Sequence, residues 1–366
     1  MAYDESNIRT LSSIEHIRQR PGMYIGRLGN GSHPEDGIYI LLKEVIDNSI
    51  DEFMEGNGSK IVVTLEGQKC SVRDYGRGIP LNKLIECVSV INTGAKYDNE
   101  AFQYSVGLNG VGTKAVNALS SYFEITSWRE GEYMHAVFER GVLKQKEKGK
   151  GEEPNGTFVS FIPDDDPAIF GKYTYNEDYI KERLWNYAYL NKGLTITFNG
   201  KTIRSPGGLM DLVKKILGDD GLYPLINYKS KNLEFSFTHT NGYGESYHSY
   251  VNGQYTSDGG THEAAFKEGV LKGINEFFHK SWAAPEIRDG IVATVAIKVM
   301  NPVFESQTKN KLGNTDVRAW IVPEVKAAVI DCLMKNKDIA KGLEDKILSN
   351  EKVHKEEAAV RNGAKE

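Results

Sequence analysis

The chain has 366 residues, with 45 lysines and arginines against 50 aspartates and glutamates, which gives a formal net charge of −5. This length is about twice that of a typical domain, so we expect two domains, each with its own core. The mild acidity argues against a protein that binds nucleic acid with its whole surface, and a DNA contact would need a local basic patch. The 37 glycines are about 10% of the 366 residues, above the usual ~7%. They indicate either flexible filler or loops whose backbone must come close to another group.

The cysteine spacing and the lack of long apolar stretches indicate the cellular compartment. Cys70, Cys87 and Cys332 lie far apart without metal-ligand spacing, which favours free thiols in a reducing cytoplasm over disulfides or a zinc site. The N-terminus lacks the apolar region of a signal peptide, and no stretch approaches the ~18 apolar residues of a membrane span. We therefore expect a soluble, cytoplasmic protein that does not contact membranes.

In chain order, the N-terminal half mixes helix and strand patterns. After a polar arm and a short helix at 12–20, residues 37–53 have apolar side chains at helical spacing, which predicts a helix with one buried face. Further predicted elements are a hairpin of strands at 60–65 and 69–74, a helix at 81–91, a long polar loop, a helix at 113–120, strands at 122–129, 133–139 and 156–163, a helix at 177–190 and a strand at 194–198. This order predicts an α+β domain with helices on one face of a mixed, mostly antiparallel sheet.

The second half is predicted to form a separate, smaller α/β domain. Glycine-rich segments predict a boundary at 205–225. Beyond it we expect strands at 233–238, 246–251 and 291–299, a helix at 261–279 and a long helical tract from Pro323. We divide the chain into an arm (1–15), a first domain (16–221) and a second domain (222–366).

The helix predicted at 37–53 carries the first candidate motif. Glu44 and Asn48 stand one turn apart, with Asp47 and Asp51 expected beside them on a polar stripe opposite the apolar face. A carboxylate that polarises water would then lie beside an amide oxygen that can bind Mg²⁺. The alternative interpretation is a solvated helix face.

Two glycine-containing loops carry the next motifs. Asp74 follows a strand and precedes Gly76 and Gly78, so its carboxylate could accept a hydrogen bond from an exocyclic amine such as that of adenine; the alternative is a capped turn. Residues 107–113 place three glycines before a helix, where N–H groups and the helix dipole favour phosphate. Their spacing is neither the Rossmann fingerprint nor a P-loop, so alone it is weak evidence. The preceding loop at 91–105 is long and polar, as a mobile lid would be.

The last candidate is a basic loop at 307–311. The Lys309 ammonium could reach a terminal phosphate across a domain interface. The alternative is a solvated basic loop.

In combination, these motifs resemble the Bergerat ATP-binding fold of the GHKL superfamily, which type II topoisomerases share with ATP-dependent chaperones, mismatch-repair proteins and sensor histidine kinases. Further segments narrow the resemblance to the N-terminal ATPase and transducer domains of bacterial type IIA topoisomerase B subunits, those of gyrase and topoisomerase IV. These segments are RQRPGMYIG at 18–26, DYGRGIP at 74–80, VNALS at 116–120, DGGTH at 258–262 and SQTK at 306–309. The resemblance covers essentially the whole chain, and chaperones and kinases lack the Gln-Thr-Lys loop.

The resemblance implies a role for each motif. Glu44 would be the general base that activates water against the γ-phosphate of ATP, Asn48 would bind Mg²⁺, and Asp74 would bind the adenine amine. The nucleotide site would also include Gly78 and Ile79 at the base, Thr157 behind Asp74 through a water, Lys96 in the lid, the phosphate loop Gly107, Leu108, Asn109, Gly110, Val111, Gly112 and Thr113, and the second-domain residues Gln307 and Lys309, which would sense the γ-phosphate. The second domain would adopt a ribosomal-protein-like transducer fold.

The resemblance also implies a gate. The arm that contains Tyr3 would swap onto a second copy of the chain and close over its nucleotide. ATP binding would dimerise two chains around a DNA duplex, and hydrolysis would release it. The implied partners are this homodimer, double-stranded DNA and a topoisomerase A subunit bound through regions beyond Glu366, in the bacterial cytoplasm at the nucleoid.

Some features depart from the family or leave choices open. Val106 stands where a second glycine is frequent, and Asn109 where gyrase commonly has histidine. No DNA-cleaving motif follows, so we expect an N-terminal fragment that hydrolyses ATP without cutting DNA. Likeness around 91–120 and the compact second domain favour topoisomerase IV over gyrase. A nucleotide-gated clamp with little turnover is the non-enzyme alternative, and Glu44 argues against it because binding alone needs no general base.

Overall fold

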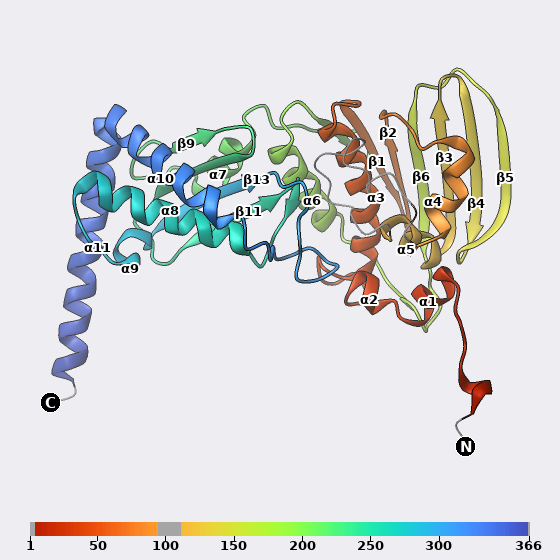
Figure 1. Ribbon diagram of the computed structural model, residues 1–366, viewed down its shortest axis with the longest axis horizontal. Coiled ribbons are helices and arrows are strands. Elements are labelled where there is room, and N and C mark those ends of the chain that lie inside the picture. The colour runs from red at the N-terminus through yellow and green to blue at the C-terminus, as the bar shows by residue number, and fades with distance from the viewer. Residues whose placement is uncertain (1–3, 92, 94–110, 365–366) are drawn as a thin grey trace. The chain divides into compact units, whose positions relative to one another are not determined.

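The computed structural model describes residues 4–91, 93 and 111–364 (Figure 1). They fall into two compact units, Met1–Ser205 and Pro206–Glu366. The division lies at the start of the expected boundary region and earlier than residue 221, because the segment between holds a helix, α7 (Leu209–Leu217). Its Val213 and Leu217 pack against Val292 of the second unit. The assignment of functional domains to the two units stays a prediction.

The first unit is built on a mixed sheet that, within the described residues, has eight strands in the order β5-β4-β3-β6-β2-β1-β7-β8. The strands are β1 (Lys60–Glu66), β2 (Lys69–Asp74), β3 (Ser120–Arg129), β4 (Glu132–Glu139), β5 (Val142–Lys150), β6 (Gly156–Pro163), β7 (Thr195–Phe198) and β8 (Lys201–Ile203). Only β1 and β7 pair in parallel; the other neighbouring strands are antiparallel. The expected mostly antiparallel sheet and its first hairpin are confirmed, whereas β5 and β8 had not been predicted.

Helices cover this sheet and form the core with it. They are α1 (Ser13–Gln19), α2 (Gly22–Ile25), α3 (Gly37–Met54), α4 (Leu84–Ser89), α5 (Gly112–Ala118) and α6 (Glu177–Leu190), with short 3-10 helices η1 (Glu5–Asn7) and η2 (Leu81–Lys83). Figure 1 shows α3 lying across the sheet near β1 and β2. Its apolar residues and those of α5 join the strands in one hydrophobic cluster.

The surroundings of α3 correct one expectation. Asp47 and Asp51 do not lie on a solvated stripe: both side chains are buried, as is Glu44. Asp47 accepts hydrogen bonds from Lys43, at 2.9 Å, and from the hydroxyl of Tyr187 in α6. The sheet and α5 pack against the helix and Tyr187 of α6 reaches Asp47, so the Asp47 carboxylate is satisfied internally rather than by water.

The second unit has a sheet that, in the described part of the chain, contains five strands in the order β12-β11-β13-β10-β9. They are β9 (Ile226–Lys229), β10 (Leu233–His239), β11 (Ser246–Val251), β12 (Gln254–Tyr255) and β13 (Ile291–Ile297). The helices of this unit, besides α7, are α8 (Thr261–Phe278), α9 (Ala284–Arg288), α10 (Arg318–Lys335) and α11 (Lys337–Gly363). Phe266 of α8 packs against Phe235 and Phe237 of β10, which joins helix and sheet into the core.

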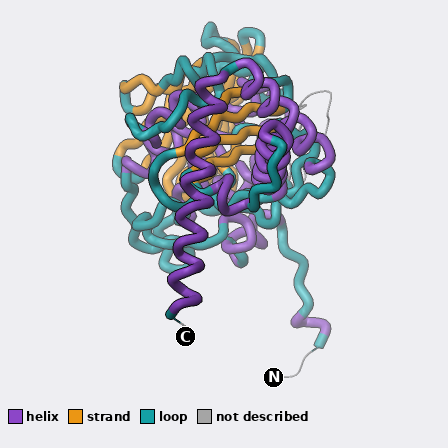
Figure 2. Tube along the Cα trace, turned by 90° about the vertical axis from the view of Figure 1, so that its left-hand side faces the viewer, coloured by secondary structure: helices purple, strands orange, loops and turns teal. Residues whose placement is uncertain are grey.

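The last helices differ from the expected tract. Helix α10 begins at Arg318 and contains Pro323, and a separate helix, α11, begins at Lys337. Burial of Ile321, Val322 and Val325 holds α10 together around the proline. In Figure 2 the last turns of α11 extend past the other elements of the second unit, consistent with their exposed side chains. Within the described residues, no helix combines the length and apolarity that crossing a membrane requires.

Candidate functional site

The carboxylate of Glu44 lies directly beside the first residue of α5. Glu44 is 4% exposed, and a Cβ on Gly112 would lie 2.3 Å from its Oε2 atom. A side chain at this position would have to displace the Glu44 carboxylate, so glycine is the residue that permits this approach. The structure thereby brings together the first and third sequence motifs, which are far apart along the chain.

A second contact between these motifs orients Asn48. Its amide nitrogen donates a hydrogen bond of 2.8 Å to the hydroxyl of Thr113. Because the nitrogen faces Thr113, the amide oxygen is directed away from that hydroxyl. Mg²⁺ prefers hard ligands such as amide and carboxylate oxygens, so the side-chain oxygens of Asn48 and Glu44 fit this ion.

Asp74, at the end of β2, is held by hydrogen bonds to both carboxylate oxygens. Oδ1 accepts from the backbone N–H groups of Gly76 (3.0 Å) and Thr157 (3.2 Å). Oδ2 accepts from the hydroxyls of Ser49 (2.8 Å) and Thr157 (2.5 Å). Thr157 therefore contacts Asp74 directly, where the resemblance implied a bridging water. The carboxylate, only 4% exposed, has a single fixed orientation.

Ser49 had not been predicted to take part. It follows Asn48 on α3 and its hydroxyl points to β2, so α3 contributes to both halves of the site. The signal in the sequence that could have identified Ser49 is a polar residue on the face of the helix that packs against the sheet.

The loop after Asp74 is fixed to β3. Gly78 has φ +77°, and a Cβ there would lie 2.6 Å from the carbonyl oxygen of Trp128. Ile79 donates its N–H to the hydroxyl of Ser127 at 2.8 Å, and this hydroxyl donates to the Ile79 carbonyl at 2.7 Å. Ser127, another residue that the sequence interpretation missed, thus sets the position of Ile79.

The same loop is also clamped to α3. Arg77 pairs with Glu52 through its Nε (3.1 Å) and terminal nitrogen (2.9 Å), and its backbone N–H donates to the same carboxylate at 3.0 Å. The hydrogen bonds that Arg77 donates to the Glu52 carboxylate raise the pKa of its guanidinium above the ordinary value. A bidentate pair restricts both partners more than a single contact, so it keeps the 74–80 loop close to α3.

The remaining predicted residues are distributed as follows. Val111, Gly112 and Thr113 are described, at the start of α5. Tyr3, Lys96, Val106, Gly107, Leu108, Asn109 and Gly110 lie outside the described residues. Gln307 and Lys309 belong to the second unit, whereas Glu44, Asn48 and Asp74 belong to the first.

Within the second unit, the loop of Gln307 and Lys309 is anchored to the DGGTH segment. Lys309 has φ +60° and its N–H donates to the Ser306 carbonyl at 3.1 Å. Asp258 donates its N–H to the Asn310 carbonyl at 3.0 Å, and Gly260 forms a bridge with Leu312. The two segments that supported the resemblance in this half therefore form one structural feature.

Comparison with known proteins agrees with both halves. The family model described as histidine kinase-, DNA gyrase B-, and HSP90-like ATPase matches residues 33–167, and the model described as DNA gyrase B matches residues 195–362. The B subunit of DNA topoisomerase 4 from Borreliella burgdorferi is 54% identical over 100% of this chain. The DNA gyrase B subunit of Thermotoga maritima is 34% identical over 98% of it. The chain spans 61% of the length of each of these relatives.

Solved structures give the same result. The ATPase domain of Thermus thermophilus gyrase B, in complex with an aminocoumarin, has a TM-score of 0.74 and 28% identity, with 96% of this chain and 98% of that chain covered. The topoisomerase IV ATP-binding domain of Francisella tularensis, in complex with an inhibitor, has the same TM-score and identity, with 93% and 97% covered.

The fold of helices on a mixed sheet is that of the GHKL ATPase class. Within this class, the chain belongs to the bacterial type IIA DNA topoisomerase B subunits. The sequence resemblance to this family is thus confirmed.

Proposed function

We propose that the chain is the ATP-hydrolysing, ATP-gated dimerisation module of a type IIA topoisomerase, and specifically of topoisomerase IV. The observation that carries this proposal is that α3 brings Glu44 and Asn48 against the first two residues of α5, while its Ser49 is hydrogen-bonded to Asp74. A general base, an amide oxygen and a buried carboxylate acceptor are the groups needed to activate water, hold a phosphate-bound cation and bind an adenine amine. Identity of 54% to a topoisomerase 4 B subunit, against 34% to a gyrase B subunit, favours topoisomerase IV.

The chemistry assigned to each residue follows from its surroundings. Glu44 accepts a proton from the water that attacks the γ-phosphate, and its burial beside Gly112 keeps the carboxylate in one place. Asn48 is the residue that would hold Mg²⁺, and when bound this ion neutralises charge on the phosphate oxygens. Asp74 binds the exocyclic amine of adenine, with Gly78 and Ile79 beside the base.

The wider mechanism includes parts that lie outside the described residues or in the second unit. Lys96 and residues 107–110 complete the nucleotide site, and Gln307 and Lys309 contact the γ-phosphate and respond to its loss. The arm with Tyr3 closes over the nucleotide of a second copy of the chain. The dimer captures duplex DNA and acts with a topoisomerase A subunit in the cytoplasm, at the nucleoid.

The decisive experiment measures ATP binding and ATP turnover separately. Glu44→Gln keeps the shape of the side chain and removes its basicity, so it should bind ATP with wild-type affinity while turnover falls by about 100-fold or more. Glu177→Gln, at an exposed position at the start of α6, is the matched control and should leave both unchanged. Unaltered turnover in Glu44→Gln would remove Glu44 from the role of base. If the wild-type chain binds ATP but does not hydrolyse it, the protein is instead a nucleotide-gated clamp.

A further inference from the structure

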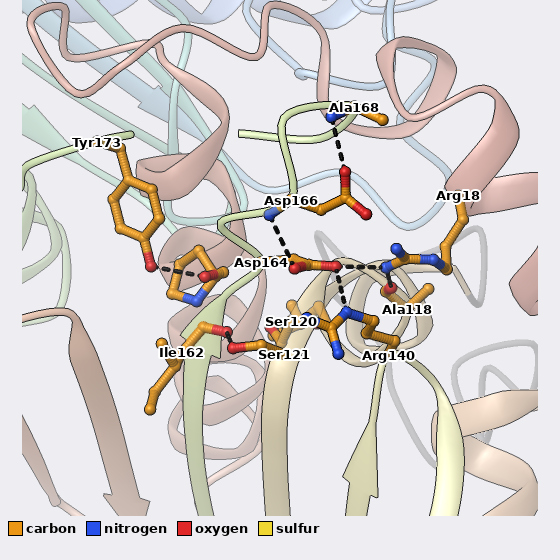
Figure 3. Close-up of polar contacts among 12 residues, drawn as sticks. Arg18, Ala118, Ser120, Ser121, Arg140, Ile162, Asp164, Asp166, Ala168 and Tyr173 are labelled. Carbon is orange, nitrogen blue, oxygen red and sulfur yellow. Dashed lines mark hydrogen bonds and ion pairs between the residues drawn. The ribbon is translucent and has the colours of Figure 1, made fainter. Parts of the chain in front are cut away.

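Arg18, in α1, contacts the C-terminal end of α5 and a buried carboxylate at the same time (Figure 3). Its guanidinium Nη1 donates to the carbonyl oxygen of Ala118 at 2.9 Å and to Oδ2 of Asp164 at 2.8 Å. Ala118 is the last residue of α5, and the N–H of Asp164 donates to the next carbonyl, that of Leu119, at 2.9 Å. Arg18 and the N–H of Asp164 therefore donate hydrogen bonds to carbonyl groups at the C-terminal end of the helix that begins at Gly112.

Asp164 is a fixed acceptor for this contact. Its side chain is fully buried, and the carboxylate also accepts from the Nε of Arg140 at 3.1 Å and from the N–H of Asp166 at 3.1 Å. Burial by itself would raise the pKa of Asp164, but the hydrogen bonds from Asp166 and the two arginines lower it overall, so the carboxylate stays charged. Removing one partner from such a group costs more than losing an exposed ion pair.

The same helix α1 joins the polar arm to the start of the 91–105 loop. Residues 4–10 are exposed and precede α1 directly. At the beginning of α1, the hydroxyl of Ser13 accepts a hydrogen bond from the N–H of Ile91 at 3.1 Å. Lys114 of α5 donates to the carbonyl oxygen of Thr93. Helix α1, which follows the arm, and α5 therefore both contact the segment that begins at Ile91, and Arg18 links α1 to Asp164.

We propose that Arg18 is a positioning residue that couples nucleotide binding at the start of α5 to the placement of the N-terminal arm, and hence to dimerisation. The inference rests on the proposed function, because it takes ATP-gated dimerisation as its output. Glu44 and Asn48 contact the first two residues of α5, and Arg18 contacts its last residue, so α5 links the candidate nucleotide site at one end to α1, the helix that follows the arm, at the other. A ligand that stabilises one position of α5 thereby stabilises one position of α1.

Arg140 provides a matched control. It binds the same oxygen of Asp164 as Arg18, but it comes from the turn between β4 and β5. Among the described residues, the side chain of Arg140 forms its hydrogen bond and ion pair with Asp164 and not with α1 or α5. A purely structural role for the charge cluster predicts that the two arginines are equivalent, whereas coupling through α1 predicts that only Arg18 controls dimerisation.

The test compares Arg18→Gln, Arg18→Lys and Arg140→Gln with the wild-type chain. We would measure the affinity of a non-hydrolysable ATP analogue at a protein concentration where the chain is monomeric, and the dimerisation constant by sedimentation with saturating analogue. Thermal unfolding without nucleotide monitors folding. In Arg18→Gln we expect dimerisation weakened by about tenfold or more, with analogue affinity within about threefold of wild type. Arg18→Lys, which can reach one acceptor, should restore part of the loss, and Arg140→Gln should dimerise like wild type.

Each other outcome overturns the inference in a recognisable way. Normal dimerisation of Arg18→Gln, or an equal loss in Arg140→Gln, rejects coupling through Arg18. A parallel loss of analogue binding and thermal stability shows a merely structural role. If the wild-type chain does not dimerise with the analogue, the proposed function fails and this inference fails with it.

Discussion

A Cβ on Gly112 would lie 2.3 Å from Oε2 of Glu44, so the first residue of α5 and the candidate general base occupy adjoining space. The next residue, Thr113, accepts the hydrogen bond of Asn48, one turn along α3 from Glu44. Two helices that are distant in sequence therefore share one contact surface made of functional groups. The position of the base depends on the backbone of α5 as much as on α3.

Gly112→Ala should damage catalysis more than folding. The added methyl group would displace the Glu44 carboxylate, and a misplacement of about 1 Å can lower turnover by about 100-fold. Steady-state ATP hydrolysis measures this loss, with analogue affinity as a separate readout. Gly22→Ala is the control, because nothing lies within 4 Å of a Cβ at that position. Wild-type turnover in Gly112→Ala would show that the Glu44 position tolerates movement and would weaken its assignment as the base.

Asp74→Asn should weaken binding of adenine nucleotides. An amide in place of the carboxylate would present N–H groups to donors such as Gly76 and Ser49, and would lose the charge-assisted acceptor. A hydrogen bond to a charged group contributes about 1.5–3 kcal/mol, so affinity should fall by about 10- to 100-fold in calorimetry. Ser49→Ala should give a smaller loss, because Thr157 still holds Asp74.

Ser71→Ala is the matched control for Ser49→Ala. Ser71 lies on the same strand as Asp74, but its hydroxyl bonds to Thr64 within the β1–β2 hairpin. It should leave nucleotide affinity unchanged. The adenine assignment is rejected if Asp74→Asn binds ATP as tightly as the wild-type chain does.

Local patterns were sufficient to predict the elements that hold the site. The hairpin of β1 and β2, which ends at Asp74, forms as predicted, and Glu66, which was expected in the turn, pairs with Lys69. Glu44 and Asn48 do stand one turn apart on α3. These features depend on spacing within one segment, which hydrophobic periodicity and turn residues report directly.

Contacts between distant segments could not be predicted in the same way. Ser49 and Ser127 are polar residues in otherwise ordinary positions, and their importance appears only when α3 meets β2 and β3 meets the 74–80 loop. The burial of Asp47 depends on Lys43 and on Tyr187, a residue from a separate helix. Periodicity describes which face is apolar, but partners that satisfy a buried carboxylate are supplied by the tertiary fold.

Deletion of residues 1–10 should abolish ATP-dependent dimerisation and leave the monomer folded. The described residues of this segment are exposed, and hydrogen bonds such as that from the Asp4 N–H to Asn7 are local to the arm, so their loss removes no core contact. Sedimentation with a non-hydrolysable ATP analogue measures the dimer, and urea unfolding without nucleotide measures stability. An intact dimer after the deletion would contradict the role of the arm.

Acidification should destabilise the second unit through His239. Burial lowers its pKa from 6.5 to about 4. The ring is held as the neutral form, since Nε2 lies 2.6 Å from the Ile287 carbonyl, to which it must donate, and Nδ1 then accepts from the Tyr223 hydroxyl. In the unfolded chain His239 binds a proton near pH 6.5, whereas in the folded chain it does so only near pH 4. The stability that depends on neutral His239 is therefore fully present above pH 6.5 and is lost as the pH falls from 6.5 toward 4.

The measurement is urea unfolding of the whole chain at pH 7 and pH 5, followed by tryptophan fluorescence, to which Trp282 and Trp320 of the second unit contribute. For one such histidine the free energy of unfolding should fall by roughly 2 kcal/mol over this interval. His239→Gln should remove that part of the pH dependence whatever its effect on stability at pH 7, while His279→Gln, at an exposed position, should retain it. If His239→Gln and the wild-type chain lose the same free energy on acidification, the protonation of His239 does not control the stability of this unit.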